Sequence, residues 1–489
     1  MLSPLIRRAG KDGKDARLKE RGVTLALIAA AMVAIIGMAA LSIDIGTLYQ
    51  AKAEAQRAAD AAALTAARMI SISGVTGVTG AGDPNMATSW QAVCGTAGTA
   101  TVAAIAIAQA QWNFVGGLAA PTVKVYYGTG TNTDCSSLAV PGSSFVVNPT
   151  VTVYVQQPNV PTFFGRIFAL IPGGTSKNSG VSATATAEVY NPSGSAFVGS
   201  DVMVPVQPRC VKPWIVPDAD PIAHAGCPNV KFVDLAGTIS CPGTFLGAPS
   251  GAIGETFNLV ADCASTGTCN SQTVPPAPYF ANPPQACATS PCAATTAPAP
   301  NLQYLPAWVQ SSSPAASSCA VVNDYQQAIA GCDNTTPYQC GVPTDDTTTP
   351  TQVNLNENPY GATGDTSVAA QCLIHASGTG PGTTQDQLVT TSFPFQIMPG
   401  SLNPLGISGT AISSSTSIVS LPIYQQTGTQ NPVTIIGFLQ VFINYVNADG
   451  SLNVTVLNVA GCSNLSTSTS PFVTGSSPVP VRLITPPTP

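Results

Sequence analysis

The stretch that decides the architecture is Gly22-Val-Thr-Leu-Ala-Leu-Ile-Ala-Ala-Ala-Met-Val-Ala-Ile-Ile-Gly-Met-Ala-Ala-Leu-Ser-Ile43, 22 consecutive residues without a charge. A helix of that length spans about 33 Å, close to the thickness of the hydrocarbon core of a bilayer. The sequence therefore predicts a transmembrane helix over residues 22–43. A cleaved signal peptide is the alternative, but the run is longer than a usual apolar signal region, and the nearest small-x-small site, Ala51-Lys52-Ala53, lies well past its end.

Charges on the two sides of this run predict its orientation. Residues 1–21 contain seven Lys or Arg against three Asp or Glu, whereas the chain beyond the run contains ten against twenty. Cytoplasmic flanks of membrane helices carry the excess of Lys and Arg. We therefore expect residues 1–21 to be a basic cytoplasmic tip. The protein would be single-pass in the inner (cytoplasmic) membrane, with its C-terminal region periplasmic or otherwise extracytoplasmic.

The composition of the 489 residues disfavours two function classes. Only 8% of residues are charged and only two are His, against about 25% charged in ordinary soluble domains, so groups for acid–base catalysis are scarce. The net charge of −6 offers no basic surplus for phosphates, which excludes nucleic acid as an expected partner. With 44 Gly and 43 Pro, the chain favours short strands and many turns over packed helices.

The cysteines agree with an exported chain. All 14 lie after residue 90, and ten lie between Cys210 and Cys340; an even number in an exported region indicates disulfides. No C-x-x-C pair is present, so the spacing does not favour zinc, and we expect neither a metal nor a cofactor. Cys94 and Cys135 are candidates to pair with each other, which would tie a helix at residues 100–114 to the strands that follow.

Beyond the apolar run the helix is expected to continue. From Asp44 to about Ile72 there is no Pro and a single Gly, which suits a long helix. Small apolar residues recur there at steps of three and four and form a packing face: Leu48, Ala51, Ala55, Ala58, Ala62, Ala66 and Met69. Two interpretations of this face stay open. The favoured one docks it on the chain's own β-sheet, and the other docks it on the helix of another subunit.

Composition and hydrophobic pattern divide the rest of the chain into four regions: an α+β unit (44–195), a Cys/Pro/Gly/Ser/Thr-rich irregular region (196–415), a β-strand region (416–465) and a Pro/Ser/Thr-rich tail (466–489). The fold class is therefore α+β, in which a transmembrane helix continues as a long helix, a small α+β unit follows, and the distal part is disulfide-rich and mostly β or irregular. Apart from residues 100–114, the elements expected from alternation and amphipathicity are a helix at 161–170, strands at 122–127, 145–147, 151–155, 181–190, 418–424, 433–446 and 452–459, and a turn at 447–450.

Candidate chemical groups are few. A tethered hydrolase would have to use His224 or His375, and neither lies in a nucleophile motif. Asp218 and Asp220 offer carboxylates for a cation, but an exposed turn is the simpler interpretation. Asp333-Asn334 and Asp345-Asp346 are expected to be solvated in polar loops. An adhesin or carbohydrate-binding module is an alternative function, and it would be favoured by solvent exposure of Trp214 or Trp308.

One recognisable pattern runs from Glu20-Arg21-Gly22 through the apolar run to Leu41-Ser-Ile-Asp44-Ile-Gly46, Tyr49 and Ala55-Gln56-Arg57-Ala58-Ala59-Asp60-Ala61-Ala62-Ala63-Leu64-Thr65-Ala66-Ala67. This pattern resembles the N-terminal residues of TadG-like Flp pilus-assembly proteins (a TadE/TadG-like N-terminal region). Val160–Phe168 and Val181–Ala187 also look like the family. Less specifically, Cys210–Asp218 and the stretch from Pro422-Ile-Tyr424 to Gly437-Phe438 are similar to C-terminal parts of some members.

The resemblance implies a non-enzymatic, membrane-anchored structural or assembly component of a Flp (tight-adherence) pilus system. The family-motif positions it assigns are Gly22, Asp44, Gly46, Tyr49, Gln56, Ala59, Asp60 and Leu64. The implied partners are the membrane, pilus or envelope assembly proteins, and a second copy through the N-terminal helix. Two features depart from relatives: Leu27 stands where processed pilins carry Glu, and no von Willebrand A motif D-x-S-x-S is present. Asp44 itself is expected to mark the outer rim of the membrane, the alternative being a pair with a basic group on a neighbouring helix.

Overall fold

The structure is a computed structural model of the chain. It describes residues 12–74, 86–95, 102–138, 144–162, 179–189, 206–222, 231–234, 239–240, 251–261, 280–281, 301–306, 309, 319, 321, 323–333, 338, 343–344, 363–391, 393–425, 433–462, 473–475, 479 and 481–485. Of the predicted helix at 161–170, the structure describes only Pro161 and Thr162. Five residues discussed above also lie outside the described ranges: His224, Trp308, Asn334, Asp345 and Asp346.

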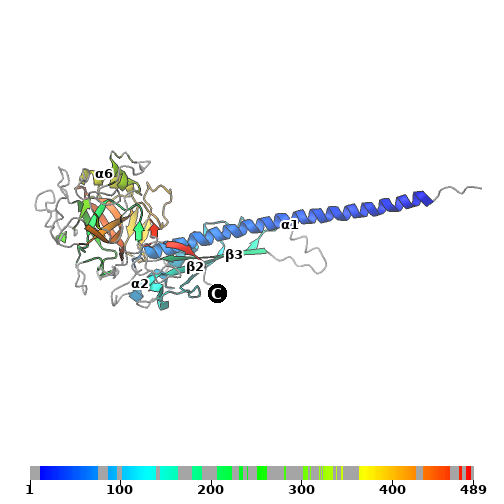
Figure 1. The fold of residues 1–489 in the computed structure, drawn as a ribbon, viewed down its shortest axis with the longest axis horizontal. Coiled ribbons are helices and arrows are strands. Elements are labelled where there is room, and N and C mark those ends of the chain that lie inside the picture. Colours follow the sequence, from blue (N-terminus) through cyan, green and yellow to red (C-terminus); the bar gives the residue numbers. More distant parts are fainter. Residues whose placement is uncertain are drawn as a thin grey trace, which may run out of the picture. The chain divides into compact units, whose positions relative to one another are not determined.

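A single helix, α1 (Asp12–Ser71), accounts for the first 60 described residues (Figure 1). At 1.5 Å per residue it is about 90 Å long. It contains no proline, and its alanines favour the helical conformation. The helix ends where Gly74 takes a positive φ of 71° and the hydroxyls of Ser71 and Ser73 donate to the carbonyls of Arg68 and Ile70 at 2.8 and 2.6 Å. The predicted continuation of the apolar helix as a long helix is confirmed.

A four-stranded sheet follows in the order β1-β2-β3-β16. Its strands are β1 (Thr122–Tyr127), β2 (Thr150–Val160), β3 (Ser179–Val189) and β16 (Val481–Ile484). Strand β16 runs antiparallel to β3, and Arg482 makes an ion pair of 3.0 Å with Glu188. Composition alone predicted a tail for residues 466–489, whereas the structure shows that Val481–Ile484 are the edge strand of this sheet.

Three short helices and a 3₁₀ turn accompany that sheet in sequence: α2 (Met86–Cys94), α3 (Val102–Gln111), η1 (Ser136–Leu138) and α4 (Ser144–Val147). Cys94 and Cys135 form the expected disulfide, but Cys94 ends α2 and not the helix at 102–111, so the disulfide ties a helix that the sequence did not reveal. The prediction of a strand at 145–147 is wrong. Phe145 is buried against Trp90, with ring centroids 5.1 Å apart, and this packing holds the segment as a helical turn.

The distal part of the chain contains a closed six-stranded barrel. Strands β12 (Ile418–Tyr424), β5 (Trp214–Pro217), β8 (Asn301–Pro306), β6 (Thr256–Ala261), β14 (Leu452–Gly461) and β13 (Val433–Val446) pair in that order, and β13 pairs again with β12. Aliphatic side chains such as Leu421, Leu439 and Val459 lie opposite one another in register and are fully buried. Side chains fill the interior of a barrel of this size.

The barrel contains strands that the sequence predicted and strands that it did not. The strands expected at 418–424, 433–446 and 452–459 and the turn at 447–450, where Gly450 has φ of 86°, are all present. The stretch 196–415 supplies three further barrel strands that its composition did not locate. The two C-terminal stretches that resembled the pilus family lie side by side here, since Ile423 of β12 pairs with Val216 of β5 and with Gly437 of β13.

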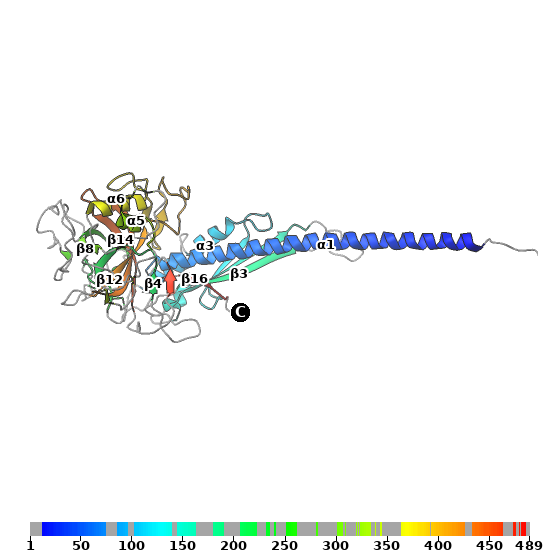
Figure 2. The same ribbon diagram turned by 45° about the horizontal axis from the view of Figure 1, so that its top comes forward.

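Smaller elements complete the distal part. They are the edge strands β7 (Phe280–Ala281) and β9 (Pro343–Thr344), the pairs β10 (Gln387–Val389) with β11 (Gln396–Met398) and β4 (Val206–Pro208) with β15 (Val473–Gly475), and the helices α5 (Asp324–Ala330) and α6 (Thr363–Leu373). Figure 2 labels both helices beside strands β8, β12 and β14. Disulfides join Cys210 to Cys332 and Cys319 to Cys372, and Cys462 is also disulfide-bonded. The predicted α+β class with a disulfide-rich, mostly β distal part is confirmed.

The chain forms two compact units. The first comprises residues 1–59, 110–123 and 154–183, and the second comprises residues 60–109, 124–153 and 184–489.

The disulfides yield a stability prediction. Cross-linking stabilises mainly by restricting the unfolded chain, and more so for longer loops. The Cys210–Cys332 bond encloses 122 residues and Cys94–Cys135 encloses 41. Replacing the first pair by alanine should therefore lower the free energy of unfolding by about 1 kcal/mol more than replacing the second pair. Denaturant melts of both double variants under oxidising conditions measure this; a larger loss for Cys94→Ala/Cys135→Ala would contradict it.

Candidate functional site

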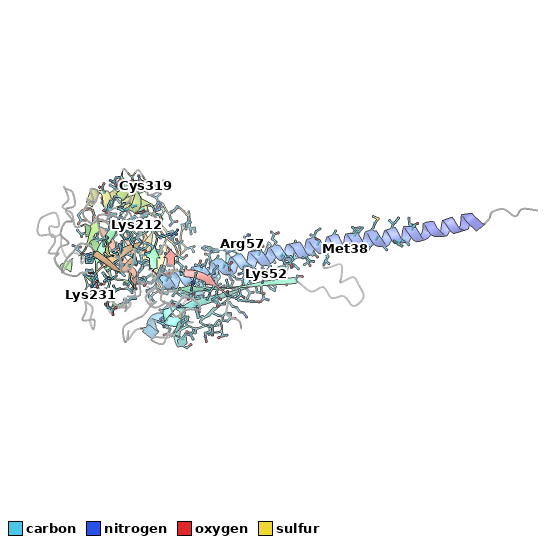
Figure 3. All side chains as sticks on the ribbon, viewed as in Figure 1. Met38, Lys52, Arg57, Lys212, Lys231 and Cys319 are labelled. Carbon is cyan, nitrogen blue, oxygen red and sulfur yellow. A yellow bond between two sulfur atoms is a disulfide. The ribbon has the colours of Figure 1, made fainter. Side chains whose placement is uncertain are left out.

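The candidate site is α1, because its two halves lie in different environments. Leu25, Val33 and Met38 are 73, 71 and 65% exposed; Figure 3 labels Met38 on this part of the helix. The most apolar 18-residue window has a mean hydropathy of 2.5, and only 6% of it is buried. This part of α1 is long and apolar enough to cross a membrane, and its large side chains are exposed in the part of the chain that the structure describes.

The second half of α1 is covered. Ala51, Ala55, Ala58, Ala62 and Ala66 have no exposed surface, and Met69 is 1% exposed. Leu48, the first residue of the predicted packing face, is half-buried. Ala59, Ala63, Ala67 and Ile70 are also fully buried, so the covered surface is wider than the stripe read from the sequence. Other residues of the same chain cover these side chains.

In the first unit, polar contacts on both sides of α1 fix its register. The backbone amide of Gly116 donates to Oε2 of Glu54 at 2.7 Å, and Glu54 Oε1 accepts from Gln50 at 3.1 Å. Gly116 has φ of 61°, and a Cβ there would lie 3.3 Å from Cβ of Ala51 and 3.0 Å from Val160. Lys52 Nζ donates to the carbonyl of Ser182 on β3. A small residue at 51 and a glycine at 116 therefore allow close approach.

In the second unit, the end of α1 meets the barrel. The side-chain amide of Asn458 on β14 donates to the carbonyl of Ser71, one of the carbonyls that a helix end leaves without an intrahelical partner. Asn458 pairs in register with Gln440, and Gln440 with Ser420, so a row of buried polar residues crosses three strands there. Just beyond the helix, a Cβ on Gly74 would lie 2.3 Å from Ile253. The chain after α1 is thus packed tightly on the barrel.

The family-motif positions fall in several environments. Gly22 lies within α1, and Gly46 is exposed with open space around its Cα. Asp44 is only 5% exposed although its neighbours Ile43 and Ile45 are 51 and 43% exposed. Tyr49 is exposed. Gln56, Asp60 and Leu64 are half-buried, and Ala59 is fully buried. The motif positions are therefore spread along α1, across the change from its exposed half to its buried half, and do not form a single cluster.

Lys212 is a buried charged group that the sequence did not point to. It is buried after Cys210, and its Nζ donates to the carbonyls of Ala328, Ile329 and Gly331 at 3.3, 2.6 and 2.7 Å, at the end of α5. Burial lowers the pKa of Lys212 to about 7, and the charge of Asp333 partly opposes this. Asp333 is 5% exposed, so the expectation of a solvated loop is wrong for this residue. The sequence does hold one indication of this buried charge, because Lys212 is the single charged residue in Cys-Val-Lys-Pro-Trp-Ile-Val-Pro.

The carboxylates considered as cation ligands bond to the backbone. Asp218 Oδ1 accepts from the amides of Phe232 and Val233 at 3.0 and 3.1 Å, and burial raises the pKa of Asp218 to about 6. Asp220 Oδ1 accepts from the amide of Ile222 at 2.9 Å. Both are buried, not in an exposed turn. No group of three or more His, Cys, Asp or Glu that could hold a metal occurs in the described residues.

The structure also describes His375, the candidate for a hydrolase, and Trp214, the candidate for carbohydrate binding. His375 follows α6 with φ of 56°, and its Nδ1 lies 3.4 Å from Thr416 Oγ1. Backbone bonds from His375 and Ala376 to Cys372 and Gln371 close the end of that helix. Trp214 is fully buried beside Tyr304, with ring centroids 5.9 Å apart. The exposed Trp214 that would have favoured a carbohydrate site is therefore not found.

Comparison with known families bears on α1 directly. Residues 22–69 match the family model described as putative Flp pilus-assembly TadE/G-like. The chain carries a TadE/G-like segment. The match begins at the exposed apolar half of α1 and ends at Met69, the last residue of the predicted packing face. No curated protein and no solved structure matches the chain. The TadE/G-like segment associates the protein with Flp pilus assembly.

Close packing of the TadE/G-like segment yields a prediction with an internal control. Ala59 is fully buried and Ala53 is exposed one and a half turns away. Adding methylenes to a well-packed site costs about 1–3 kcal/mol, whereas an exposed helix position tolerates leucine. Ala59→Leu should therefore lower the unfolding temperature and Ala53→Leu should leave it unchanged, as measured by circular dichroism in detergent. Equal melting of both variants would contradict the assigned face.

Lys212 yields a pH prediction. Its pKa is about 7 in the folded chain against an ordinary value of 10.5, so above pH 7 the unfolded chain binds the proton more tightly. The free energy of unfolding should rise with pH between about 7 and 10.5, by up to about 1.4 kcal/mol per unit. Below pH 7 both states hold the proton and this contribution is constant.

The matched variant for this prediction is Lys212→Met, which keeps the length of the side chain without the titrating group. Denaturant melts at intervals from pH 6.5 to 9 should show a steeper rise for the natural chain than for Lys212→Met. Parallel curves for the two proteins would show that Lys212 does not titrate in this range.

Proposed function

We propose that the protein is a non-enzymatic, membrane-anchored structural or assembly component of a Flp (tight-adherence) pilus system. The observation that carries this proposal is the position of the TadE/G-like match, residues 22–69, on a helix whose first half is apolar and exposed and whose second half is buried in the chain. Such a helix suits a bilayer at one end and a folded body at the other.

In this proposal α1 crosses the inner membrane once. The basic residues before Gly22 lie in the cytoplasm, in line with the positive-inside rule. The disulfides support an oxidising compartment for the remainder, since Cys94–Cys135, Cys210–Cys332 and Cys319–Cys372 all lie after the helix. The part of the chain that follows residue 43 would then stand on the periplasmic side.

The protein acts by contact with other components of the pilus or envelope. A second copy of the chain would meet it through the exposed half of α1, because the alanine-rich half is already covered within the chain. The barrel is the part free to face other envelope proteins.

The test is a C-terminal epitope tag on the full chain, followed by separation of sheared surface filaments, inner membrane and outer membrane. Full-length tagged protein in the inner membrane, resistant to carbonate extraction, is the expected result. A shortened form in sheared filaments would instead make the protein a processed filament subunit or a tip adhesin, and would overturn the proposal.

A matched pair of variants sharpens this test. Two lysines at the centre of the exposed half, Val33→Lys/Ile36→Lys, should cost about 5–7 kcal/mol of insertion free energy and release the protein from the membrane fraction. Leu402→Lys/Leu405→Lys places the same charges on exposed residues of the distal part and should leave fractionation unchanged. Retention of the first variant in carbonate-washed membranes would contradict the assignment of residues 24–43 to the bilayer.

A further inference from the structure

The first unit exposes three aromatic side chains. Tyr49 on α1 is 74% exposed, and Trp112 and Phe114, which follow α3, are 54 and 64% exposed. The other tryptophans of the described residues, Trp90 and Trp214, are fully buried. Among the described residues, large aromatic surface is therefore offered to the surroundings in one part of the molecule, the part that carries the apolar half of α1.

A fixed turn, and not a loose loop, presents two of these side chains. We call residues 112–118 the aromatic turn. Two backbone hydrogen bonds between Val115 and Leu118, of 2.9 and 3.1 Å, close the turn. The side chain of Val115, within the turn, is fully buried. The amide of Gly116 holds it to Glu54 of α1. Trp112 and Phe114 therefore stay exposed while the backbone between and beside them is anchored.

The anchor point lies close to the end of the exposed apolar half. The last exposed aliphatic residue there is Ile45, 43% exposed. Along a helix, Tyr49 lies about 6 Å further on, Ala51 about 9 Å and Glu54 about 14 Å. The headgroup layer adds about 5–7 Å on each side of the hydrocarbon core. Tyr49 thus falls at headgroup depth, and the aromatic turn is attached one to two helical turns beyond it.

The chain between Gly116 and the two ring-bearing residues is short. Phe114 is two residues from Gly116 and Trp112 is four, so their Cα atoms lie at most about 7 and 14 Å from the Cα atom of Gly116. Both rings are therefore held near the point at which Gly116 contacts Glu54 of α1. Trp and Tyr concentrate at membrane–water interfaces, where an apolar ring and a polar N–H or O–H are both satisfied.

We propose that Tyr49 and the aromatic turn lie in the lipid headgroup layer on the side of the membrane that holds the chain after residue 43. This rests on the proposed membrane crossing of α1. Tyr49 follows the exposed apolar half on the same helix, and the aromatic turn is anchored to that helix at Glu54; lipid is the occupant that covers these exposed side chains. The contact gives the first unit a second attachment to the bilayer besides α1, which restricts its rotation about the helix axis and its height above the membrane.

The test uses tryptophan fluorescence of the full-length protein in vesicles of phosphatidylethanolamine and phosphatidylglycerol. The signal of Trp112 is the difference between the natural chain and Trp112→Phe. In vesicles with lipids brominated near the carbonyl it should be quenched at least two-fold more than in vesicles with lipids brominated near the chain end. Trp90→Phe is the control, because the difference signal of that buried residue should be insensitive to either lipid.

Flotation of the same vesicles separates the possible failures. Protein that floats with the lipid while its Trp112 signal is quenched by aqueous acrylamide and not by brominated lipid would overturn the headgroup contact and leave the membrane anchor intact. Protection of Trp112 from both quenchers, increasing with protein density in the vesicle, would assign the surface to a second copy of the chain and also overturn the proposal. Failure to float would overturn the membrane anchor and, with it, this contact.

Discussion

Burial of the alanine face of α1 is the interaction on which the rest of the structure depends. Alanine offers little apolar area per residue, so the stabilisation comes from close approach along several helical turns, with many van der Waals contacts made at once. Ala51 beside Gly116 illustrates the geometry, because neither position has room for a larger side chain. The same residues combine high helix propensity with small size, so one composition supports both the long helix and its packing.

The remaining features follow from the two ends of that helix. At one end the large aliphatic side chains of α1 are exposed among the described residues, which fits the proposed position of this half in a bilayer. At the other end Asn458 satisfies the carbonyl of Ser71 and the chain enters a closed barrel. The barrel leaves few free strand edges, and disulfides hold the loops around it. The TadE/G-like segment therefore joins the exposed apolar half of α1 to the half that is buried in the folded chain.

Local patterns predicted the parts of the fold that depend on local sequence. The helix through residues 22–69 follows from hydropathy and alanine content, and β13 and β14 follow from alternation with a turn at Gly450 between them. Strands β5, β6 and β8 were not located, because they are short, flanked by Gly and Pro, and defined by pairing with residues far away in the chain. At Phe145 the error is the opposite one: alternation predicted a strand, but the residue lies in a helical turn and packs on Trp90. Lys212 could be noticed as a lone charge, but its acceptors lie more than 110 residues away.

The most direct test of the account is the topology of α1 in cells. Spheroplasts with an intact inner membrane, carrying one tag before residue 12 and another at the C-terminus, would be treated with protease from outside. The account predicts that the N-terminal tag is protected until the membrane is dissolved and that the C-terminal tag is removed or detached at once. Protection of both tags, or loss of both, would contradict a helix that crosses the membrane once with its folded units outside the cytoplasm.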